Sequence, residues 1–245
     1  MTDLPAIETW ANAYPRGGGV APHAHNFGQV AFARRGVMRV LAQGGVWVVP
    51  PGRALWIPAR VVHEVQCRTD VAMRTVYLRA DSQLPYRKEL AVLAVTPLLR
   101  EIILRLVEGP VDETTRPHLL PLLEAELRAG QVMPLNLPQP RDPRLARAVA
   151  RLTDDPAARG TLEHWAAQAG MARRSFARRF AVETGLSFGV WRRRLRMLWA
   201  IEQLAVGEPV TVVALDAGYD SVSAFIQAFR QEMGVTPGRY FAGEG

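Results

Sequence analysis

Arginine is concentrated in one short segment of the chain, and its chemistry suits a polyanion. Between Ala172 and Arg196 the sequence has eight arginines against one acidic residue, Glu183, a local net charge of 8 − 1 = +7. The whole chain also carries +7, so the remainder is close to neutral. A guanidinium group presents a planar fork of donors that fits phosphate and the edge of guanine. The segment is therefore predicted to bind a polyanion, with a solvated helix face as the alternative.

The composition is that of an ordinary folded protein. With 245 residues, 49% of them hydrophobic and 22% charged, the chain suits two compact domains or one large one. Its single cysteine, Cys67, excludes an internal disulfide and fits a reducing compartment. No apolar run reaches membrane-spanning length, and the N-terminal residues lack the pattern of a secretion signal. We therefore expect a cytoplasmic protein with no membrane partner.

One pattern of small, apolar and glycine positions occurs twice, in residues 162–191 and 210–240. Each copy predicts a helix, a glycine turn and a second helix, which is the order of a helix-turn-helix. Two such units in one chain predict a protein that reads two neighbouring places on a repetitive partner, and duplex DNA is the obvious candidate. The matched residues include Ala166, Gly170, Phe176 and Phe180 in the first copy and Ala214, Gly218, Phe225 and Phe229 in the second.

Helical periodicity and capping residues predict that everything from Arg144 onward is helical. The longest predicted helix runs from Ser187 to about Ala205, roughly 27 Å at 1.5 Å per residue. That length has the scale needed to separate two recognition helices by one turn of DNA, ~34 Å. The other predicted helices are Arg144–Leu152, Leu162–Ala169 with Thr161 as N-cap, Arg173–Glu183, Val212–Ala217 with Thr211 as N-cap, Val222–Glu232 after Asp220 or Ser221, and a short helix from Thr236.

The outward faces of the two predicted recognition helices hold the candidate DNA contacts. Arg174 and Arg178 are i, i+4 neighbours, and each can bind guanine, with phosphate contact alone as the alternative. Gln227 on the second helix can bind adenine bidentately. The arginines at 192–194 lie on successive faces of the long helix and are predicted to bind phosphate or to be solvated. The candidate contacts are Arg173, Arg174, Ala177 and Arg178 in the first unit, and Ser221, Val222, Ser223, Ile226, Gln227 and Arg230 in the second.

These two units resemble the AraC/XylS family of bacterial transcription regulators. The resemblance covers about the last hundred residues and is carried by LEHWAAQAGMARRSFARRFAVETGLSFGVWRRRLRM and VTVVALDAGYDSVSAFIQAFRQEMGVTPGRYF. It implies double-stranded DNA bound in two adjacent major grooves, base-reading positions on the ridge of Arg174 and Arg178, a homodimer, and RNA polymerase as a further partner. One residue departs from the family, because Ala172 stands where a capping residue is common. A lost N-cap costs about 1 kcal/mol and removes a hydroxyl that could contact phosphate.

Short apolar runs predict β-structure in the first part of the chain. Between residues 20 and 80 these runs alternate with glycine and proline, which favours a sandwich or a small barrel. Gln43-Gly44-Gly45 is predicted to be a hairpin turn, since glycine accepts the positive φ that such turns need. The predicted strands are Gln29–Ala33, Val37–Ala42, Val46–Val49, Ala54–Ile57, Val61–Val65 and Val71–Leu78.

The spacing of apolar residues changes after the predicted strands. Leucine-rich spacing from Leu90 to Leu127 predicts helices within residues 85–130, which either cap the barrel or form a dimer seam. Residues 131–143 hold four prolines and little periodicity, so they are predicted to be the interdomain linker. The predicted organisation is an effector domain at 1–84, a helical region at 85–130, the linker at 131–143 and a DNA-binding domain at 144–245.

Three histidines and a glutamine form the second group of residues suited to chemistry. His23-Ala24-His25, Gln29, Gly36 and His63 resemble the motifs of a cupin barrel. Side chains in a strand repeat every second residue, so the dyad is expected to place two imidazoles on one face. The resemblance implies that His63 comes from a strand facing them across the barrel. Three imidazoles and an oxygen ligand suit a divalent transition metal, although Gln29 stands where cupins usually have a carboxylate.

The same four residues support two other interpretations. They can hydrogen-bond an organic effector in an apolar pocket, or they can be satisfied residues of the barrel. The expected fold class is multidomain α+β, with an N-terminal cupin or jelly-roll β-barrel, then helices, then an all-α double helix-turn-helix domain. No cofactor is expected to be required, and a divalent metal in the barrel stays an alternative.

A one-component transcription regulator accounts for both parts of the chain. In this hypothesis a small-molecule effector binds the cupin domain, and the helix-turn-helix units bind a promoter. The sequence leaves open whether the protein is an activator or a repressor. The alternative is a metal-dependent cupin enzyme, such as a dioxygenase or an isomerase, with a helical accessory domain. That alternative leaves the arginine-rich repeat unexplained, and no catalytic arrangement of side chains stands out, so we expect no enzyme.

Overall fold

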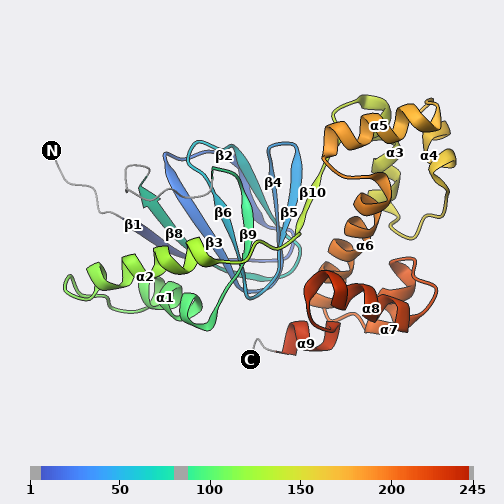
Figure 1. Ribbon diagram of the computed structural model, residues 1–245. Helices are drawn as coiled ribbons and strands as arrows, with labels where there is room; N and C mark the ends of the chain where they lie inside the picture. The colour runs from blue at the N-terminus through green and yellow to red at the C-terminus, as the bar shows by residue number, and fades with distance from the viewer. Residues whose placement is uncertain (1–6, 80–87, 243–245) are drawn as a thin grey trace. The chain divides into compact units, whose positions relative to one another are not determined.

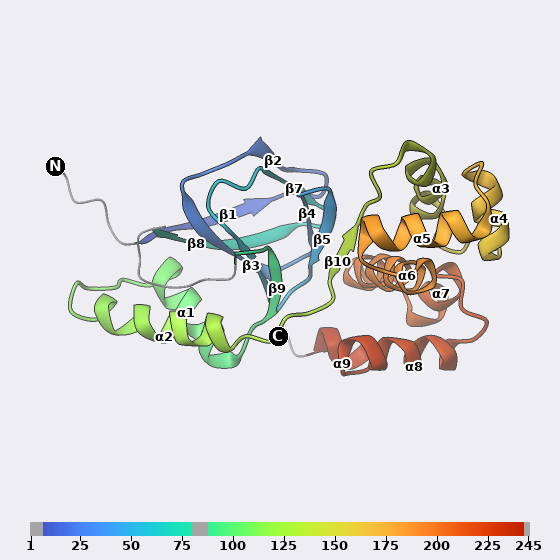
Figure 2. The same ribbon diagram turned by 45° about the horizontal axis from the view of Figure 1, so that its top comes forward.

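The computed structural model describes residues 7–79 and 88–242, which form two compact units (Figures 1 and 2). The first unit extends to Pro134, and the second begins at Leu135 and also takes in Gly44–Val46. The predicted boundary between residues 84 and 85 lies outside the described residues. The helices of this described part include none long and apolar enough to cross a membrane.

Two antiparallel β-sheets form a β-sandwich-like region, and most of their strands belong to the first unit. The strand order is β1-β8-β3-β6-β9 in one sheet and β10-β5-β4-β7-β2 in the other. Each sheet ends in edge strands, so the two sheets are not closed, and the prediction of a barrel is wrong on this point. The strands are β1 (Ile7–Tyr14), β2 (Gly19–His23), β3 (Phe27–Arg35), β4 (Met38–Ala42), β5 (Gly45–Val49), β6 (Arg53–Ile57), β7 (His63–Cys67), β8 (Val71–Arg79), β9 (Ala91–Ala94) and β10 (Asn136–Pro138).

All six predicted strands are present as β3 to β8, and so is the hairpin turn between β4 and β5. Gln43 and Gly44 have φ of 49° and 70°, so both residues adopt the left-handed region that a two-residue hairpin turn uses. The sequence prediction missed β1, β2 and β9. It also placed helix where β9 pairs with β6, with Ala91 opposite Trp56. The linker prediction likewise missed β10, a strand of only three residues.

Two helices follow β9 and cover the first sheet. Helix α1 (Pro97–Glu108) begins where the Thr96 hydroxyl accepts the Leu99 N–H at 3.0 Å and proline occupies the first turn. Its apolar stripe is buried in the same core as residues of β1, β3, β6 and β8. Helix α2 (Arg116–Ala129) packs beside α1, as Figure 1 shows. Of the two roles left open by the sequence, covering the sheet is the one observed within this unit.

The second unit is helical from Pro143 onward. The long helix α6 runs between α3–α5 and α7–α9 in Figures 1 and 2. Thr161, Ser187 and Ser221 cap α4, α6 and α8 through their hydroxyl groups, as predicted. The Thr211 cap is wrong, because α7 begins two residues earlier than predicted, at Val210 behind Pro209. The helices are α3 (Pro143–Asp154), α4 (Leu162–Gln168), α5 (Arg173–Thr184), α6 (Phe188–Ala205), α7 (Val210–Asp216), α8 (Val222–Met233) and α9 (Pro237–Ala242).

Candidate nucleic-acid interface and ligand site

Helices α5 and α8 occupy equivalent places in two copies of one small fold. The phenylalanines one helical turn apart on each are fully buried, as the repeat predicts: Phe176 and Phe180 on α5, Phe225 and Phe229 on α8. In each copy the helix that precedes them packs against the same buried face through a small residue, Ala166 or Ala214. The shared core therefore fixes which face of α5 and α8 points outward.

The turns that lead into α5 and α8 have the same geometry. Gly170 and Gly218 have φ of 63° and 78°, the left-handed region that glycine adopts without strain. One residue later, the N–H of Met171 donates to the carbonyl of Ala166 at 2.9 Å, and the N–H of Tyr219 donates to Ala214 at 3.1 Å. Two helix-turn-helix units are therefore present, as the sequence predicts.

The outward face of α5 is basic and exposed. Arg174 and Arg178 are both exposed, and neither makes an ion pair or a hydrogen bond within residues 7–79 and 88–242. Ala177, which lies between them, is half-buried. Arg173 is also exposed, but its guanidinium group pairs with Glu163 at 2.6 Å. Two guanidinium groups on one ridge are therefore available to an incoming partner without breaking an internal contact.

The outward face of α8 has a different chemistry. Ser223, Gln227 and Arg230 are exposed, whereas Val222 and Ile226 are half-buried. The remaining candidate on this side, Ser221, uses its hydroxyl to accept the Ala224 N–H at 3.1 Å, which caps the helix. Exposed Ala224 and Gln231 belong to the same surface and were missed by the sequence prediction, although the repeat matches them to residues of α5.

Five of the eight clustered arginines have internal partners. Arg179 pairs with Asp142 at 2.8 Å and with Glu183 at 3.2 Å. Three arginines of α6 are half-buried and donate to backbone carbonyl groups. The prediction that Arg192 and Arg194 bind phosphate or are solvated is therefore wrong. Of residues 192–194, Arg193 alone is exposed. The five are Arg173, Arg179, Arg192, Arg194 and Arg196. The positive surface is therefore smaller than the charge count indicates.

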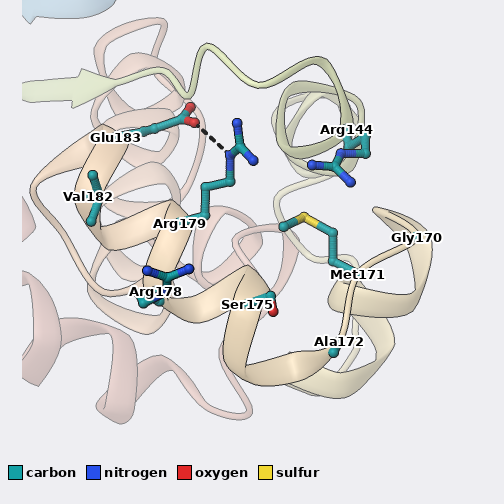
Figure 3. A pocket seen from close by; sticks show the side chains of 9 residues that line it. All are labelled: Arg144, Gly170, Met171, Ala172, Ser175, Arg178, Arg179, Val182 and Glu183. Atoms are coloured by element: carbon teal, nitrogen blue, oxygen red, sulfur yellow. Dashed lines mark hydrogen bonds and ion pairs between the residues drawn. The ribbon is translucent and has the colours of Figure 1, made fainter.

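A hollow of about 640 Å³ lies beside α5 (Figure 3). Arg144 borders it from α3, and Arg178 and Arg179 border it from α5. The sequence prediction did not name Arg144 or Ser175 here, although Ser175 lies one helical turn before Arg178 on the predicted helix. The lining residues are Arg144, Gly170, Met171, Ala172, Ser175, Arg178, Arg179, Val182 and Glu183.

Two carboxylates fix the arginines on one side of this hollow. Glu183 accepts the backbone N–H groups of Arg141 and Asp142 at 2.7 and 2.9 Å, and these bonds lower the pKa of its carboxyl group. Asp142 caps α3 by accepting the Arg144 N–H at 2.8 Å. Hydrogen bonds from the Arg144 side chain and backbone hold the pKa of Asp142 at about 2. Arg179 therefore acts as part of an ion-pair network that joins α3 to α5.

The first unit brings the three predicted histidines together. The imidazole centroids of His23 and His63 are 4.2 Å apart, and that of His25 lies 5.1 Å from His63. Each of the three histidines has one ring nitrogen that lies within 4.8 Å of a ring nitrogen of both other histidines. Their positions in the fold differ from the prediction. His63 is the direct partner of His23 on the neighbouring strand of the same sheet, and His25 lies in the loop after β2.

Each imidazole is oriented by a backbone carbonyl close in sequence. Nδ1 of His23 donates to the carbonyl of Ala21 at 2.8 Å. In the same way, Nδ1 of His25 donates to Phe27 at 2.7 Å, and Nδ1 of His63 donates to Val61 at 3.0 Å. A neutral imidazole with its proton on Nδ1 keeps a lone pair on Nε2. His23 and His63 can therefore present Nε2 to one ligand, and His25 can do so when a cation replaces the proton between its Nε2 and Gln29 Oε1, which are 2.8 Å apart.

The rest of the cluster is buried and contains an amide. His63 Nε2 is buried and makes no hydrogen bond among the described residues, and burial lowers the pKa of this imidazole. Gln29, on β3 of the other sheet, is buried and places Oε1 2.8 Å from His25 Nε2. Tyr77 packs edge-on against His25 with 5.0 Å between centroids. An orphaned nitrogen and an inward amide oxygen are suited to a cation or to a hydrogen-bonding ligand.

Comparison with known proteins matches two family models to successive parts of the chain. The AraC-like ligand binding domain model matches residues 11–160, and the Helix-turn-helix domain model matches residues 165–243. The transcriptional regulator NimR of Escherichia coli is 34% identical over 223 residues, which are 90% of this chain and 81% of NimR. The regulator ExsA of Pseudomonas aeruginosa is 28% identical over 86% of this chain and 76% of ExsA.

Solved structures add one relative with a bound target. The DNA-binding domain of the transcriptional factor AdpA, in complex with a target DNA, is 34% identical and covers 42% of this chain and 92% of that domain, with a TM-score of 0.39. The identity to NimR over nearly the whole chain and the match of the ligand-binding domain model to most of the chain establish the relationship. The chain belongs to the AraC family of DNA-binding transcription regulators, with an N-terminal ligand-binding domain.

Proposed function

We propose that α5 and α8 read adjacent major grooves of an operator, and that the histidine cluster of the first unit binds the signal that controls this reading. In the first groove Arg174 and Arg178 bind guanine edges, with Arg173 and Ala177 beside them. In the second groove Gln227 binds adenine, with Ser221, Val222, Ser223, Ile226 and Arg230 around it. The observation that carries the DNA part is the pair of exposed guanidinium groups on one ridge of α5, which have no partner among the residues that the structure describes.

Selection of genomic fragments by the purified protein, followed by gel-shift titration, tests the DNA part. A regulator that reads bases is expected to bind selected fragments about 10³-fold or more tighter than scrambled fragments of the same length at moderate salt. Equal affinity for selected and scrambled fragments would contradict base reading by either helix. Homodimerisation, a soluble cytoplasmic location and contact with RNA polymerase are further parts of the proposal, supported so far only by the family.

For the ligand-binding domain we propose a divalent transition metal held by Nε2 of His23, His25 and His63. The residues fit such an ion because each Nδ1 is satisfied by a carbonyl, which is the usual way a ligating imidazole is oriented. Gln29 supplies a neutral oxygen in place of a carboxylate. When bound, the ion would offer an open coordination position to a donor atom of an effector. The chain's own residues orient the imidazoles and exclude water from His63.

Absorption of added Co²⁺ tests the metal part, with elemental analysis of the purified protein as a second measurement. His63→Ala is expected to abolish stoichiometric binding, whereas His118→Ala, on α2, is expected to leave it unchanged. If the unaltered protein shows no saturable binding of Co²⁺, the metal proposal is contradicted, and the cluster is then best explained as a hydrogen-bonding site for an organic effector. A regulator requires no catalysis, so we propose that the protein is not an enzyme. Turnover of a substrate that depends on the metal would contradict this and favour a cupin enzyme.

Regulation requires that the effector distinguish two states of the protein. An effector shifts DNA binding only as far as its affinity differs between the DNA-competent and incompetent states. The proposal therefore expects Co²⁺, or an effector added with it, to change operator affinity. Gel shifts with and without Co²⁺ measure the change, and His118→Ala again serves as the control.

A further inference from the structure

Helix α6 carries three half-buried arginines that donate to carbonyls of three other segments: the loop between α3 and α4, the segment before α3, and the turn before α8. Arg192 donates to Gly160 at 2.9 Å and also to Ala158, in the loop between α3 and α4. Arg194 donates to the side chain of Asn136 at 3.1 Å, in the segment before α3. Burying a guanidinium group without a carboxylate partner is costly unless its donors are satisfied, so these contacts are specific structural features.

Arg196 differs from the other two because it contacts both the segment that leads into the first helix-turn-helix unit and the turn of the second. Its Nε donates to the carbonyl of Pro156 at 3.0 Å, just before the first unit. Its Nη1 donates to the carbonyl of Gly218 at 3.1 Å, in the turn of the second unit. One planar group therefore joins the entry to α4, the central helix and the turn that leads into α8.

The approach at Gly218 is too close for any other residue. A Cβ built on Gly218 would lie 2.7 Å from Arg196 Nη2 and 2.9 Å from the Cα of Ala157. A second contact joins the same two loops on the surface, where Arg159 lies 3.6 Å from Asp220. Both partners of that pair are more than nine-tenths exposed, so it contributes little. Among the described residues, the half-buried guanidinium group of Arg196 is the better protected of these two links.

We propose that Arg196 is a positioning residue that sets the distance and rotation between recognition helices α5 and α8, and thereby the operator spacing that the protein accepts. This inference rests on the proposed function, in which the two helices read adjacent grooves. A guanidinium fork fixes both direction and distance, whereas the single ammonium of lysine cannot hold two carbonyls in a fixed geometry. Each inserted base pair moves the second half of the operator by ~3.4 Å and rotates it by roughly 36° about the DNA axis. A rigid pair of readers must therefore discriminate sharply between spacings.

The experiment compares Arg196→Lys with the unaltered protein on operators that differ only in spacing. The fragments are one selected by the unaltered protein and two derivatives with one base pair inserted or deleted between the two contacted halves. The unaltered protein is expected to lose affinity at least about tenfold on either derivative, because one half loses its base contacts. Arg196→Lys is expected to bind the natural spacing more weakly and to discriminate among the three fragments within roughly threefold.

Two matched lysine variants on the same helix serve as controls. Arg194→Lys alters a half-buried arginine whose hydrogen bonds go to Asn136 and not to the second unit, and lysine keeps the positive charge that faces Glu232 of α8, so it is expected to keep the discrimination of the unaltered protein. Arg192 contacts only the loop that leads into the first unit, so Arg192→Lys is also expected to keep the discrimination between spacings. Thermal unfolding monitored by circular dichroism confirms that each variant is folded. If Arg196→Lys does not fold, Arg196→Gln, whose single amide cannot hold both carbonyls, is expected to reduce discrimination in the same way.

The outcomes separate the inference from the proposed function. A uniform loss by Arg196→Lys at all three spacings, with the discrimination ratio unchanged, would overturn the positioning role. The same loss of discrimination in Arg194→Lys would overturn the assignment to Arg196. Failure of the unaltered protein to select any fragment contradicts base reading itself, and this result is seen before any variant is made.

Discussion

Arg174 and Arg178 on α5 correspond by the repeat to Ser223 and Gln227 on α8, and this difference sets the chemistry of the two readers. A bidentate arginine binds guanine with a charged donor pair, whereas glutamine binds adenine with a neutral amide. Both arginines are free of internal ion pairs among the described residues. The first unit is therefore expected to contribute more to affinity and to specificity than the second.

Replacing Arg178 with alanine is expected to weaken operator binding by about 1–3 kcal/mol, roughly five- to 150-fold, and to relax specificity at one base. Gln227→Ala is expected to cost less, because no charge is lost. Quantitative gel shifts at fixed salt measure both. Arg128→Ala, at an exposed arginine of α2 in the first unit, removes the same charge outside α5 and α8 and controls for general electrostatic attraction. Equal or reversed losses for Arg178 and Gln227 would overturn the ranking.

At the scale of elements, α5 lacks the hydroxyl cap that begins α4, α6 and α8. Ala172 has φ −65° and ψ 144°, the extended conformation of an N-cap, but its side chain accepts no hydrogen bond. Ala172→Ser is expected to stabilise the protein by about 1 kcal/mol, because it satisfies one free N–H of the first turn. Urea unfolding measures the change. Ala181→Ser, at an exposed position inside the same helix, is expected to be slightly destabilising, and a gain of equal size there would contradict a capping effect.

The ion-pair network that joins α3 to α5 is expected to depend on pH. Asp142 has a folded pKa of about 2, below the usual value of 3.8. Its ionised form therefore adds stability above about pH 4, and this contribution is lost as the pH falls through the folded pKa near 2. The difference in urea midpoint between the unaltered protein and Asp142→Asn is expected to be full at pH 7 and to shrink between pH 4 and pH 2. A difference that stays constant over that range would show that the carboxylate charge is not responsible.

The success of sequence reasoning differed between elements for physical reasons. The helix-turn-helix units were predicted correctly because glycine turns, hydroxyl caps and phenylalanines at i, i+4 are local signals. Strand β9 was missed because its apolar residues also fit a helical spacing, and only its pairing with β6 decides the conformation. The histidines were identified, but their arrangement was not, because strand pairing placed His63 beside His23 and left His25 in a loop.

At the scale of the whole molecule, the net charge of +7 overstates the surface available to DNA. Five of the eight arginines between Ala172 and Arg196 already hold carboxylates or carbonyl groups. The number of these charges can be counted from the sequence. Which arginines are buried could not be predicted, because this depends on which side of α6 packs against the rest of the unit. The dependence of DNA binding on salt should therefore reflect the exposed arginines alone.

Two adjacent arginines of α6 allow this to be tested. Arg193 is exposed and Arg194 is half-buried against Asn136. Arg193→Gln is expected to reduce the slope of log affinity against log salt by about 1, as for the loss of one phosphate contact. Arg194→Gln is expected to leave the slope unchanged, whatever it does to stability. Gel shifts over a series of salt concentrations measure both slopes, and equal changes would mean that burial does not decide the contribution of an arginine to binding.

The two helix-turn-helix units share one fold, but the outward faces of their recognition helices have different side chains. A single bound chain therefore has a direction along DNA. An operator read by Arg174 and Arg178 at one end and by Gln227 at the other has no internal symmetry, so its sequence has a direction. Inverting the operator would turn the whole molecule around with respect to the start of transcription. The orientation of the site, and not only its position, then becomes information that a promoter can encode.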